Sequence, residues 1–176
     1  MLTPPGSPPG PYTIYVDLGK WKLGWAIFSD TTKELVVAGT YRHVRPTNRE
    51  HRPRDVAQGF VAHVVEHWPE DAPGSWVVEW PKLYSHKRKE HQDIQTLLDV
   101  GHQIEALLGR PARKYAPSTW KGNVPKPPHH KRLRRELANE AYQDGRLRDN
   151  NHDTWDAVGI GLFHLGRTGR GGVRKK

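Results

Sequence analysis

The sequence predicts an α/β fold, a mixed five-stranded sheet flanked by helices. Short apolar runs rich in β-branched and aromatic residues predict the strands. Longer stretches with apolar residues at helical spacing predict the helices. Their order in the chain, three strands followed by alternating helices and strands, is typical of one sheet with helices packed on its faces.

The first three strands are predicted around residues 12–16, 23–28 and 34–40. They follow one another closely enough to form an antiparallel meander. A helix is predicted over residues 55–68, where apolar residues recur at helical spacing until a proline ends the pattern. A short apolar strand then follows at residues 76–79.

The second half of the chain continues this alternation. A long helical pattern covers residues 94–108, and residues 113–116 read as a short strand. Residues 117–136 are basic and are expected to be irregular, leading to a short helix that runs to about residue 142. The last helix is predicted from about residue 151 to 166.

With 176 residues, the chain is long enough for one domain with a real core, which we expect at residues 12–167. Residues 1–11 are rich in proline and glycine, and residues 168–176 in glycine, arginine and lysine, so both segments are expected to be flexible. The N-terminal segment lacks the features of a signal peptide, and no stretch approaches the roughly 18 apolar residues of a membrane span. We therefore expect a cytoplasmic protein without membrane contact.

The charge of the chain narrows the choice of partner. The formal net charge is +9 and the isoelectric point about 9.9, values that fit a partner carrying many phosphates better than a neutral small molecule. Nucleic acid is the first such partner to consider. Because the chain has no cysteine, any metal ion must be held by oxygen or imidazole ligands.

Acidic residues stand where two predicted strands end and where the last helix begins. Asp17 and Glu79 end the first and fourth strands, and Asp153 and Asp156 lie three residues apart on one face of the helix. Four carboxylates converging from these elements would hold two Mg²⁺ ions about 3.5–4 Å apart, the arrangement used for phosphodiester cleavage. Mn²⁺ is an alternative ion for the same ligands.

Each acid alone has a simpler explanation. An aspartate after a strand, such as Asp17, is often only a turn residue. Asp153 lies near the start of a predicted helix, where its negative charge would simply complement the helix dipole. Glu79 is harder to explain this way, because glutamate is disfavoured at the end of an apolar strand unless something pairs with it. His152 is either a ligand, a proton carrier or simply a surface histidine. Together the four acids favour a metal site.

Four short motifs occur in a fixed order over residues 12–166: Asp17-Leu-Gly19 with Gly24-Trp-Ala26, then Val78-Glu79, then Tyr115-Ala-Pro-Ser-Thr-Trp-Lys121, then His152-Asp-Thr-Trp-Asp-Ala157. This ordered set resembles the RuvC-type Holliday junction resolvases. The resemblance implies an RNase H-like fold, a homodimer, and metal-dependent, symmetric nicking of four-way DNA junctions in recombination and repair.

By this resemblance, Asp17, Glu79, Asp153 and Asp156 take the places of the four metal-binding acids of the family, the third of which is a histidine in some members. Lys121 corresponds to a basic residue of the family, and Lys131 or Arg132 approximates the next. The divergence would suit a bacteriophage member, located in a bacterial cell or a phage-infected host.

The family also implies an aromatic or bulky residue that wedges into the junction after the strand-terminal acid. Tyr84 is the favoured candidate for this wedge, because Trp80 directly follows Glu79 and would be core. Four tryptophans are candidates for stacking on DNA bases: Trp21, Trp25, Trp80 and Trp120. A tryptophan in a strand or beside a helix more often belongs to the core or to an interface.

Two basic clusters flank the acids in the sequence. A charge run is often only a solvated face, but two clusters beside an acidic site in a chain of this charge favour contact with DNA phosphates. The candidate DNA-binding residues are Lys82, Tyr84, His86, Lys87, Arg88 and Lys89 after the fourth strand, and Lys121, Lys126, Lys131, Arg132, Arg134 and Arg135 before the last helix.

Several functions remain open at this point. The first is a metal-dependent junction resolvase, with Lys121 countering charge in the transition state and the helix at residues 94–108 forming the dimer. The alternatives are another nuclease of the same fold acting on RNA, flaps or branched DNA, and a catalytically silent nucleic-acid-binding module. A sugar-kinase or actin-type fold also begins with Asp-x-Gly, but the chain is too short for two such domains.

Overall fold

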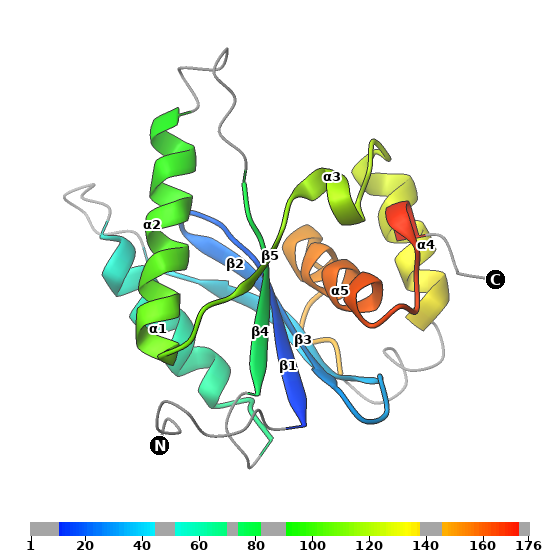
Figure 1. Cartoon of the computed structure of the whole chain (residues 1–176), viewed down its shortest axis with the longest axis horizontal. Coiled ribbons are helices and arrows are strands. Elements are labelled where there is room, and N and C mark those ends of the chain that lie inside the picture. Colours follow the sequence, from blue (N-terminus) through cyan, green and yellow to red (C-terminus); the bar gives the residue numbers. More distant parts are fainter. Residues whose placement is uncertain (1–10, 45–51, 70–73, 82–90, 138–145, 173–176) are drawn as a thin grey trace.

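The computed structural model describes residues 11–44, 52–69, 74–81, 91–137 and 146–172. Over these residues the chain forms a five-stranded sheet with helices on both faces (Figure 1). This confirms the predicted mixed α/β fold. Within the same residues, the helices are too short or too polar to cross a membrane.

The sheet combines an antiparallel and a parallel half, in the order β3-β2-β1-β4-β5. Strands β1 (Tyr12–Asp17), β2 (Lys22–Ser29) and β3 (Leu35–Arg42) form the predicted antiparallel meander. Strand β4 (Ser75–Glu79) lies parallel to β1, and β5 (Arg113–Tyr115) lies parallel to β4. The carboxyl ends of β1, β4 and β5 therefore meet at one end of the sheet.

Two helices cover one face of the sheet, α1 (Pro53–Val65) and α2 (His91–Leu108) (Figure 1). Pro53 starts α1, where its missing N–H group costs no helical hydrogen bond. The core between these helices and the sheet includes the fully buried Trp25 and Trp76.

The other face is covered by α5 (His152–His164), with α4 (Lys126–Leu137) packed on it and the short α3 (Pro117–Trp120) beside them. The irregular structure expected at residues 117–136 is therefore wrong for most of that segment. Pro117 begins α3, and Pro127 and Pro128 lie in the first turn of α4, where a backbone donor is not needed, so these prolines are compatible with the helices.

The tryptophans divide between core and partly exposed positions. Trp25 and Trp120 are fully buried, which confirms the core interpretation for these two residues. Trp21 and Trp80 are partly buried and pack against the core on the α1 and α2 face. Lys114 places its ammonium 3.8 Å from the centre of the Trp80 ring.

Two segments beyond the main elements also pack against the domain. Residues 146–148 lie along β3, where the Ala38 N–H donates to Arg146 O at 2.8 Å and Ala38 O accepts from the Arg148 N–H at 2.9 Å. Thr168 is buried, and Arg132 donates to the carbonyl of Gly171 in the 3-10 turn η2 (Arg170–Gly172). The packed chain thus reaches residue 172, beyond the boundary expected at residue 167.

Candidate acidic active site

The first two acids are placed side by side by the strand register. Asp17 is the last residue of β1 and Glu79 the last of the parallel strand β4, and the two are direct partners across the pair. Alternation along β1 sends Tyr15 and Asp17 to the face covered by α5, because Tyr15 belongs to the core cluster on that side. The carboxylates of both strand ends therefore point toward the start of α5.

The start of α5 approaches the sheet at Gly24. Gly24 of β2 is paired with Asp17, and a Cβ atom at this position would overlap the backbone carbonyl of Asp153. Only glycine permits this close approach of helix and strand. The contact brings the first turn of α5, which carries Asp153 and Asp156, next to the ends of β1 and β4.

Hydrogen bonds fix the N-terminus of α5 in this position. The side chain of Asn151 accepts from the Asp153 N–H at 3.4 Å and from the Lys22 ammonium at 2.8 Å. Thr154 donates to the carboxylate of Asp149 and lies 2.7 Å from the hydroxyl of Thr40 on β3. These contacts tie the helix start to β2 and β3, so the placement of its acids depends on the sheet.

Asp156 is almost fully buried and is surrounded by positive charge. Its carboxylate lies 3.1 Å from the ammonium of Lys121, 2.8 Å from that of Lys126 and 2.8 Å from Nε2 of His130. Burial alone would raise the pKa of Asp156, but the His130 hydrogen bond and the two lysine charges outweigh it and hold the pKa well below its ordinary value. Asp156 is therefore ionised.

The pKa of Asp17 shifts the other way. Asp17 keeps some surface at the mouth of the site, but protein surrounds it on most sides, and this burial raises its pKa well above the ordinary value. The charges of Glu79, Asp156 and Asp153 raise the pKa further. Such mutual repulsion among carboxylates is the electrostatic signature of a place suited to a cation.

Burial also raises the pKa of Glu79. Lys121 and a 2.9 Å hydrogen bond from the Trp120 indole act in the opposite direction, because both favour the ionised carboxylate. Asp153 is paired with the ammonium of Lys22 at 2.5 Å. Asp153, Asp156 and Glu79 thus each have a cationic partner or a hydrogen-bond donor, whereas repulsion by the neighbouring carboxylates acts on Asp17.

The predicted basic residues reach different places. Lys121 and Lys126 contact Asp156, as described above. Arg132 and Arg134 each donate to a partner in the protein, Arg132 to the carbonyl of Gly171 and Arg134 to the side-chain oxygen of Asn150 at 3.0 Å. Lys131 and Arg135 are exposed on α4. The remaining candidates lie outside the described residues: Lys82, Tyr84, His86, Lys87, Arg88 and Lys89.

Sequence reasoning did not foresee the contacts that three further residues make with the acids. His130 binds Asp156, Trp120 binds Glu79 and Lys22 binds Asp153. The spacing of Lys126 and His130, four residues apart, would have placed both on one face of a helix, had the helix been recognised. His152 is exposed, as the simpler interpretation expected, and its ring stacks on that of His130 at 5.8 Å.

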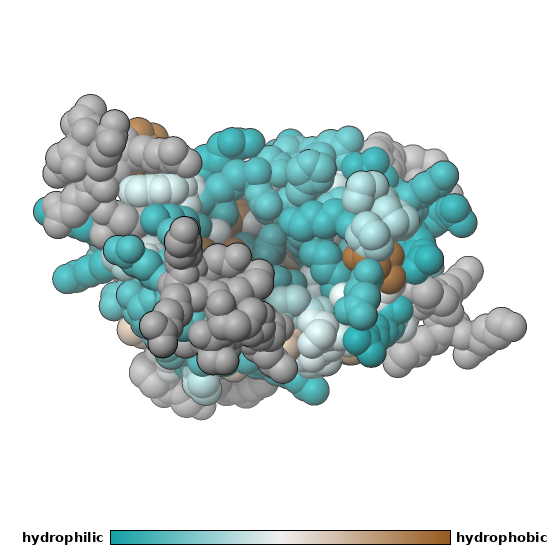
Figure 2. Space-filling view, turned by 90° about the horizontal axis from the view of Figure 1, so that it is seen from above, coloured by the Kyte–Doolittle hydropathy of each residue, from teal (hydrophilic) through white to brown (hydrophobic). Residues whose placement is uncertain are grey.

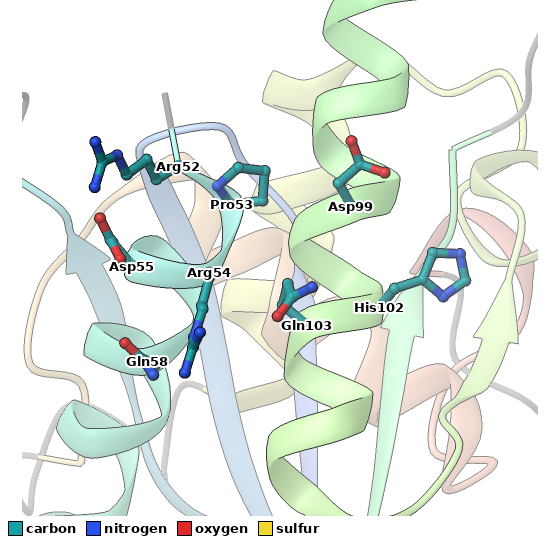
Figure 3. Close-up of a pocket in the computed structure, with 8 residues that line it drawn as sticks. All are labelled: Arg52, Pro53, Arg54, Asp55, Gln58, Asp99, His102 and Gln103. Carbon is teal, nitrogen blue, oxygen red and sulfur yellow. The ribbon is translucent and has the colours of Figure 1, made fainter. Parts of the chain in front are cut away.

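A polar groove lies elsewhere, between α1 and α2 on the opposite face of the sheet (Figure 3). None of the four acids lines this groove. Seen from above, the described surface of the molecule is mostly hydrophilic (Figure 2). The groove is lined by Arg52, Pro53, Arg54, Asp55, Gln58, Asp99, His102 and Gln103.

The donors at the acidic site suit a hard divalent cation. Asp17, Glu79, Asp153 and Asp156 offer only carboxylate oxygens, the ligands that Mg²⁺ and Mn²⁺ prefer. The raised pKa of Asp17 indicates that the acids repel one another without a cation. In the metal-free protein, part of this negative charge is compensated by the lysines that pair with Asp153 and Asp156.

The strand order, with an antiparallel and a parallel half and helices on both faces, agrees with the sheet expected for an RNase H-like fold. No protein-family model and no curated protein sequence matches the chain. Among solved structures, T. thermophilus RuvC in complex with a Holliday junction substrate has a TM-score of 0.59 and 16% identity, covering 88% of this chain and 92% of that chain.

Two further structures share this fold. A structure of Thermus thermophilus RuvC has a TM-score of 0.56 and 15% identity, covering 87% of this chain and 92% of that chain. The yeast mitochondrial Holliday junction resolvase Ydc2 has a TM-score of 0.51 and 12% identity, covering 93% of this chain and 82% of that chain. The chain is thus similar in fold to Holliday junction resolvases over most of its length.

Proposed function

We propose that the protein is a metal-dependent endodeoxyribonuclease that resolves four-way DNA junctions by paired, symmetric nicks. The observation that carries this proposal is the meeting of four carboxylates from β1, β4 and α5 at one end of the sheet. The fold likeness to RuvC and Ydc2 supports the same class of substrate, since one of those structures contains a Holliday junction.

In this proposal Asp17, Glu79, Asp153 and Asp156 hold two Mg²⁺ or Mn²⁺ ions. The chemistry supplied by bound ions of this kind is activation of the attacking water and stabilisation of the leaving oxygen. The residues of the chain contribute the geometry: the strand register fixes Asp17 against Glu79, and Gly24 fixes the start of α5 against both.

In the proposal Lys121 acts on the reacting phosphate as well as pairing with Asp156. Its ammonium is largely buried and lies 3.1 Å from Asp156, so it is held beside the reacting phosphate rather than in bulk solvent. A fixed positive charge at this position counters the negative charge that builds up on the phosphate in the transition state. Lys126, whose side chain is half exposed, contacts the DNA backbone.

The DNA-binding surface extends from Lys126 along α4, where Lys131 and Arg135 are exposed four residues apart on one face. Arg132 and Arg134 adjoin this face, although each already has a partner in the protein. Further phosphate contacts are proposed for residues that follow Glu79 in the sequence and lie outside the described residues: Lys82, Tyr84, His86, Lys87, Arg88 and Lys89. The net charge of +9 favours such phosphate contacts.

A homodimer follows from the symmetry of the substrate. A four-way junction has two-fold symmetry, and two matched cuts in opposing strands require two active sites related by the same axis. Helix α2 is the proposed dimer element. Ile94, Leu97 and Leu98 on this helix are only partly buried.

A cleavage assay on a synthetic four-way junction tests the proposal. The wild-type protein is incubated with no metal, with Mg²⁺ and with Mn²⁺, and paired nicks are expected only with metal. Asp17→Asn is expected to abolish cleavage while junction binding is retained, because it removes one ligand charge but no DNA contact. Asp55→Asn, an exposed acid on α1, serves as the matched control and should cleave normally.

The same assay separates this proposal from its alternatives. Duplex, flap, RNA–DNA hybrid and four-way junction substrates compete in one reaction, and preferential cleavage of the junction is expected. Preference for the hybrid or the flap would assign the site to another nuclease of this fold. Binding without cleavage under every metal condition, or full activity of Asp17→Asn, would overturn the proposed nuclease.

A further inference from the structure

A second group of possible metal ligands lies on the opposite face of the sheet from the acids. His63, Glu66 and His67 are at the C-terminal end of α1, and each offers one ligand atom within 4.8 Å of the other two. The rings of His63 and His67 pack beside Trp25, which belongs to the core on the α1 and α2 face. The group is therefore separate from the acidic site.

The two imidazoles are arranged as metal ligands are. Nδ1 of His67 lies 2.9 Å from the carbonyl of His63, so Nδ1 must carry the proton and donate it. This hydrogen bond leaves Nε2 as the ring nitrogen available to a ligand, which is the pattern found when a backbone carbonyl orients a metal-binding histidine. His63 precedes His67 by four residues, and the centres of the two rings are 4.8 Å apart.

The surroundings of the group favour a positive ion. The group lies where α1 ends, and the helix dipole there attracts positive charge. The exposed Glu66 supplies a negative ligand at the solvent side.

We propose that His63, Glu66 and His67 bind one divalent transition-metal ion of the Zn²⁺ type, with water completing the coordination. Two imidazoles and a carboxylate suit Zn²⁺, whereas Mg²⁺ prefers all-oxygen sites such as the acidic one. Ligands about 2.0–2.1 Å from a tetrahedral ion are about 3.3–3.4 Å apart, so the side chains must close slightly on binding. The bound ion would clamp the last turn of α1 to the residues that follow it.

Calorimetric titration of the full chain with Zn²⁺ in excess Mg²⁺ tests this proposal. Excess Mg²⁺ occupies the acidic site, and one Zn²⁺ per chain is expected to bind elsewhere. Glu66→Gln and His67→Gln should each weaken this binding at least about tenfold, because even loss of a hydrogen-bond partner of a ligand costs about 10–100-fold. His102→Gln, an exposed histidine on α2, is the matched control and should bind as wild type does.

Nitrogen-15 NMR of the histidine rings provides a second readout that needs no variant. Zn²⁺ is expected to shift Nε2 of His67 while Nδ1 stays protonated, and to shift one ring nitrogen of His63. Zn²⁺ binding that is unchanged in both Gln variants, or NMR shifts confined to other histidines, would overturn the site. Since neither readout uses DNA cleavage, the result stands apart from the proposed nuclease activity.

Discussion

Asp17 illustrates how a residue suited to cation binding destabilises the protein without one. Its pKa is raised by burial and by the neighbouring carboxylates, from an ordinary value of 3.8. The folded state therefore binds more protons than the unfolded state between the two pKa values, and the stabilising proton is lost as pH rises through that range. At neutral pH Asp17 therefore lowers the free energy of unfolding compared with acidic pH.

Asp17→Asn is consequently expected to raise the melting temperature of the metal-free protein at neutral pH. The gain should be several degrees, since about 1 kcal/mol corresponds to about 2–4 °C in a domain of this size. It should vanish below the unfolded pKa of aspartate, about 3.9, where Asp17 is protonated in both states. Calorimetry in chelator at both pH values measures this, with Asp55→Asn as control, and an unchanged or lower melting temperature at neutral pH would contradict it.

Trp120 tunes Glu79 through the 2.9 Å hydrogen bond from its indole. Trp120→Phe removes the donor to the ionised carboxylate, so the pKa of Glu79 should rise further. If ionised Glu79 is needed for cleavage, the acidic limb of the pH–rate profile should move to higher pH, with little change at alkaline pH. Trp155→Phe is the matched control, because the Trp155 indole donates to Asn150 and not to an acid; identical profiles for both variants would refute this role.

Individual residues of the site were predictable to different degrees. The structure brings Asp17, Glu79 and the Asp153–Asp156 pair together as their positions at strand ends and on one helix turn predicted. His130 was not predictable, because its role depends on the helix that places it one turn after Lys126. The Trp120 contact with Glu79 depends on tertiary packing between α3 and β4, which no local pattern encodes.

At the level of elements, the contact of α5 with β2 at Gly24 controls the geometry of the site. Gly24→Ala would force the Asp153 backbone away from the sheet and displace both acids of α5. We expect a loss of about 1–3 kcal/mol in stability from overpacking and, because small misplacements are costly in catalysis, about 100-fold slower cleavage. Melting temperature and junction cleavage rate are the measurements.

Gly39→Ala on β3 is the control for this substitution. A Cβ at Gly39 would meet only side-chain atoms, the nearest at 3.2 Å, which can shift by a few tenths of an ångström. The effects of Gly39→Ala on stability and cleavage should be clearly smaller than those of Gly24→Ala. Equal cleavage rates for Gly24→Ala and wild type would show that the position of the α5 N-terminus does not matter.

The elements themselves were predicted wherever the apolar period was clear. The five strands and helices α1, α2 and α5 occur where the sequence placed them, within a few residues at their ends. Helix α4 was missed over most of its length because its buried side includes His129 and His130 as well as Leu133 and Leu137, so few apolar residues mark its period. Its prolines added to the irregular appearance of the segment.

For the molecule as a whole, the proposed dimer is tested by substitutions on α2. Leu97 and Leu98 lie three and four residues after Ile94, and in the described part of the chain none of the three is among the residues packed against either core cluster. Ile94→Glu combined with Leu98→Glu should convert a dimer to a monomer and abolish paired nicking. Gln95→Glu on the same helix is the control.

Light scattering coupled to size-exclusion chromatography gives the mass of the wild type and of each variant. A junction labelled on two strands distinguishes single nicks from paired nicks. A wild-type protein that is monomeric at the concentrations of the cleavage assay would contradict the dimer. So would a double variant that still elutes as a dimer.

The pairing of residues 146–148 with β3 has a consequence for behaviour at high concentration. A border strand with free backbone groups invites strand addition by another chain, and thereby aggregation. At Ala38 both the N–H and the carbonyl are already bonded to Arg146 and Arg148, and the opposite border strand, β5, is only three residues long. At Ala38, in the middle of β3, these bonds therefore oppose the addition of a strand from another copy of the chain.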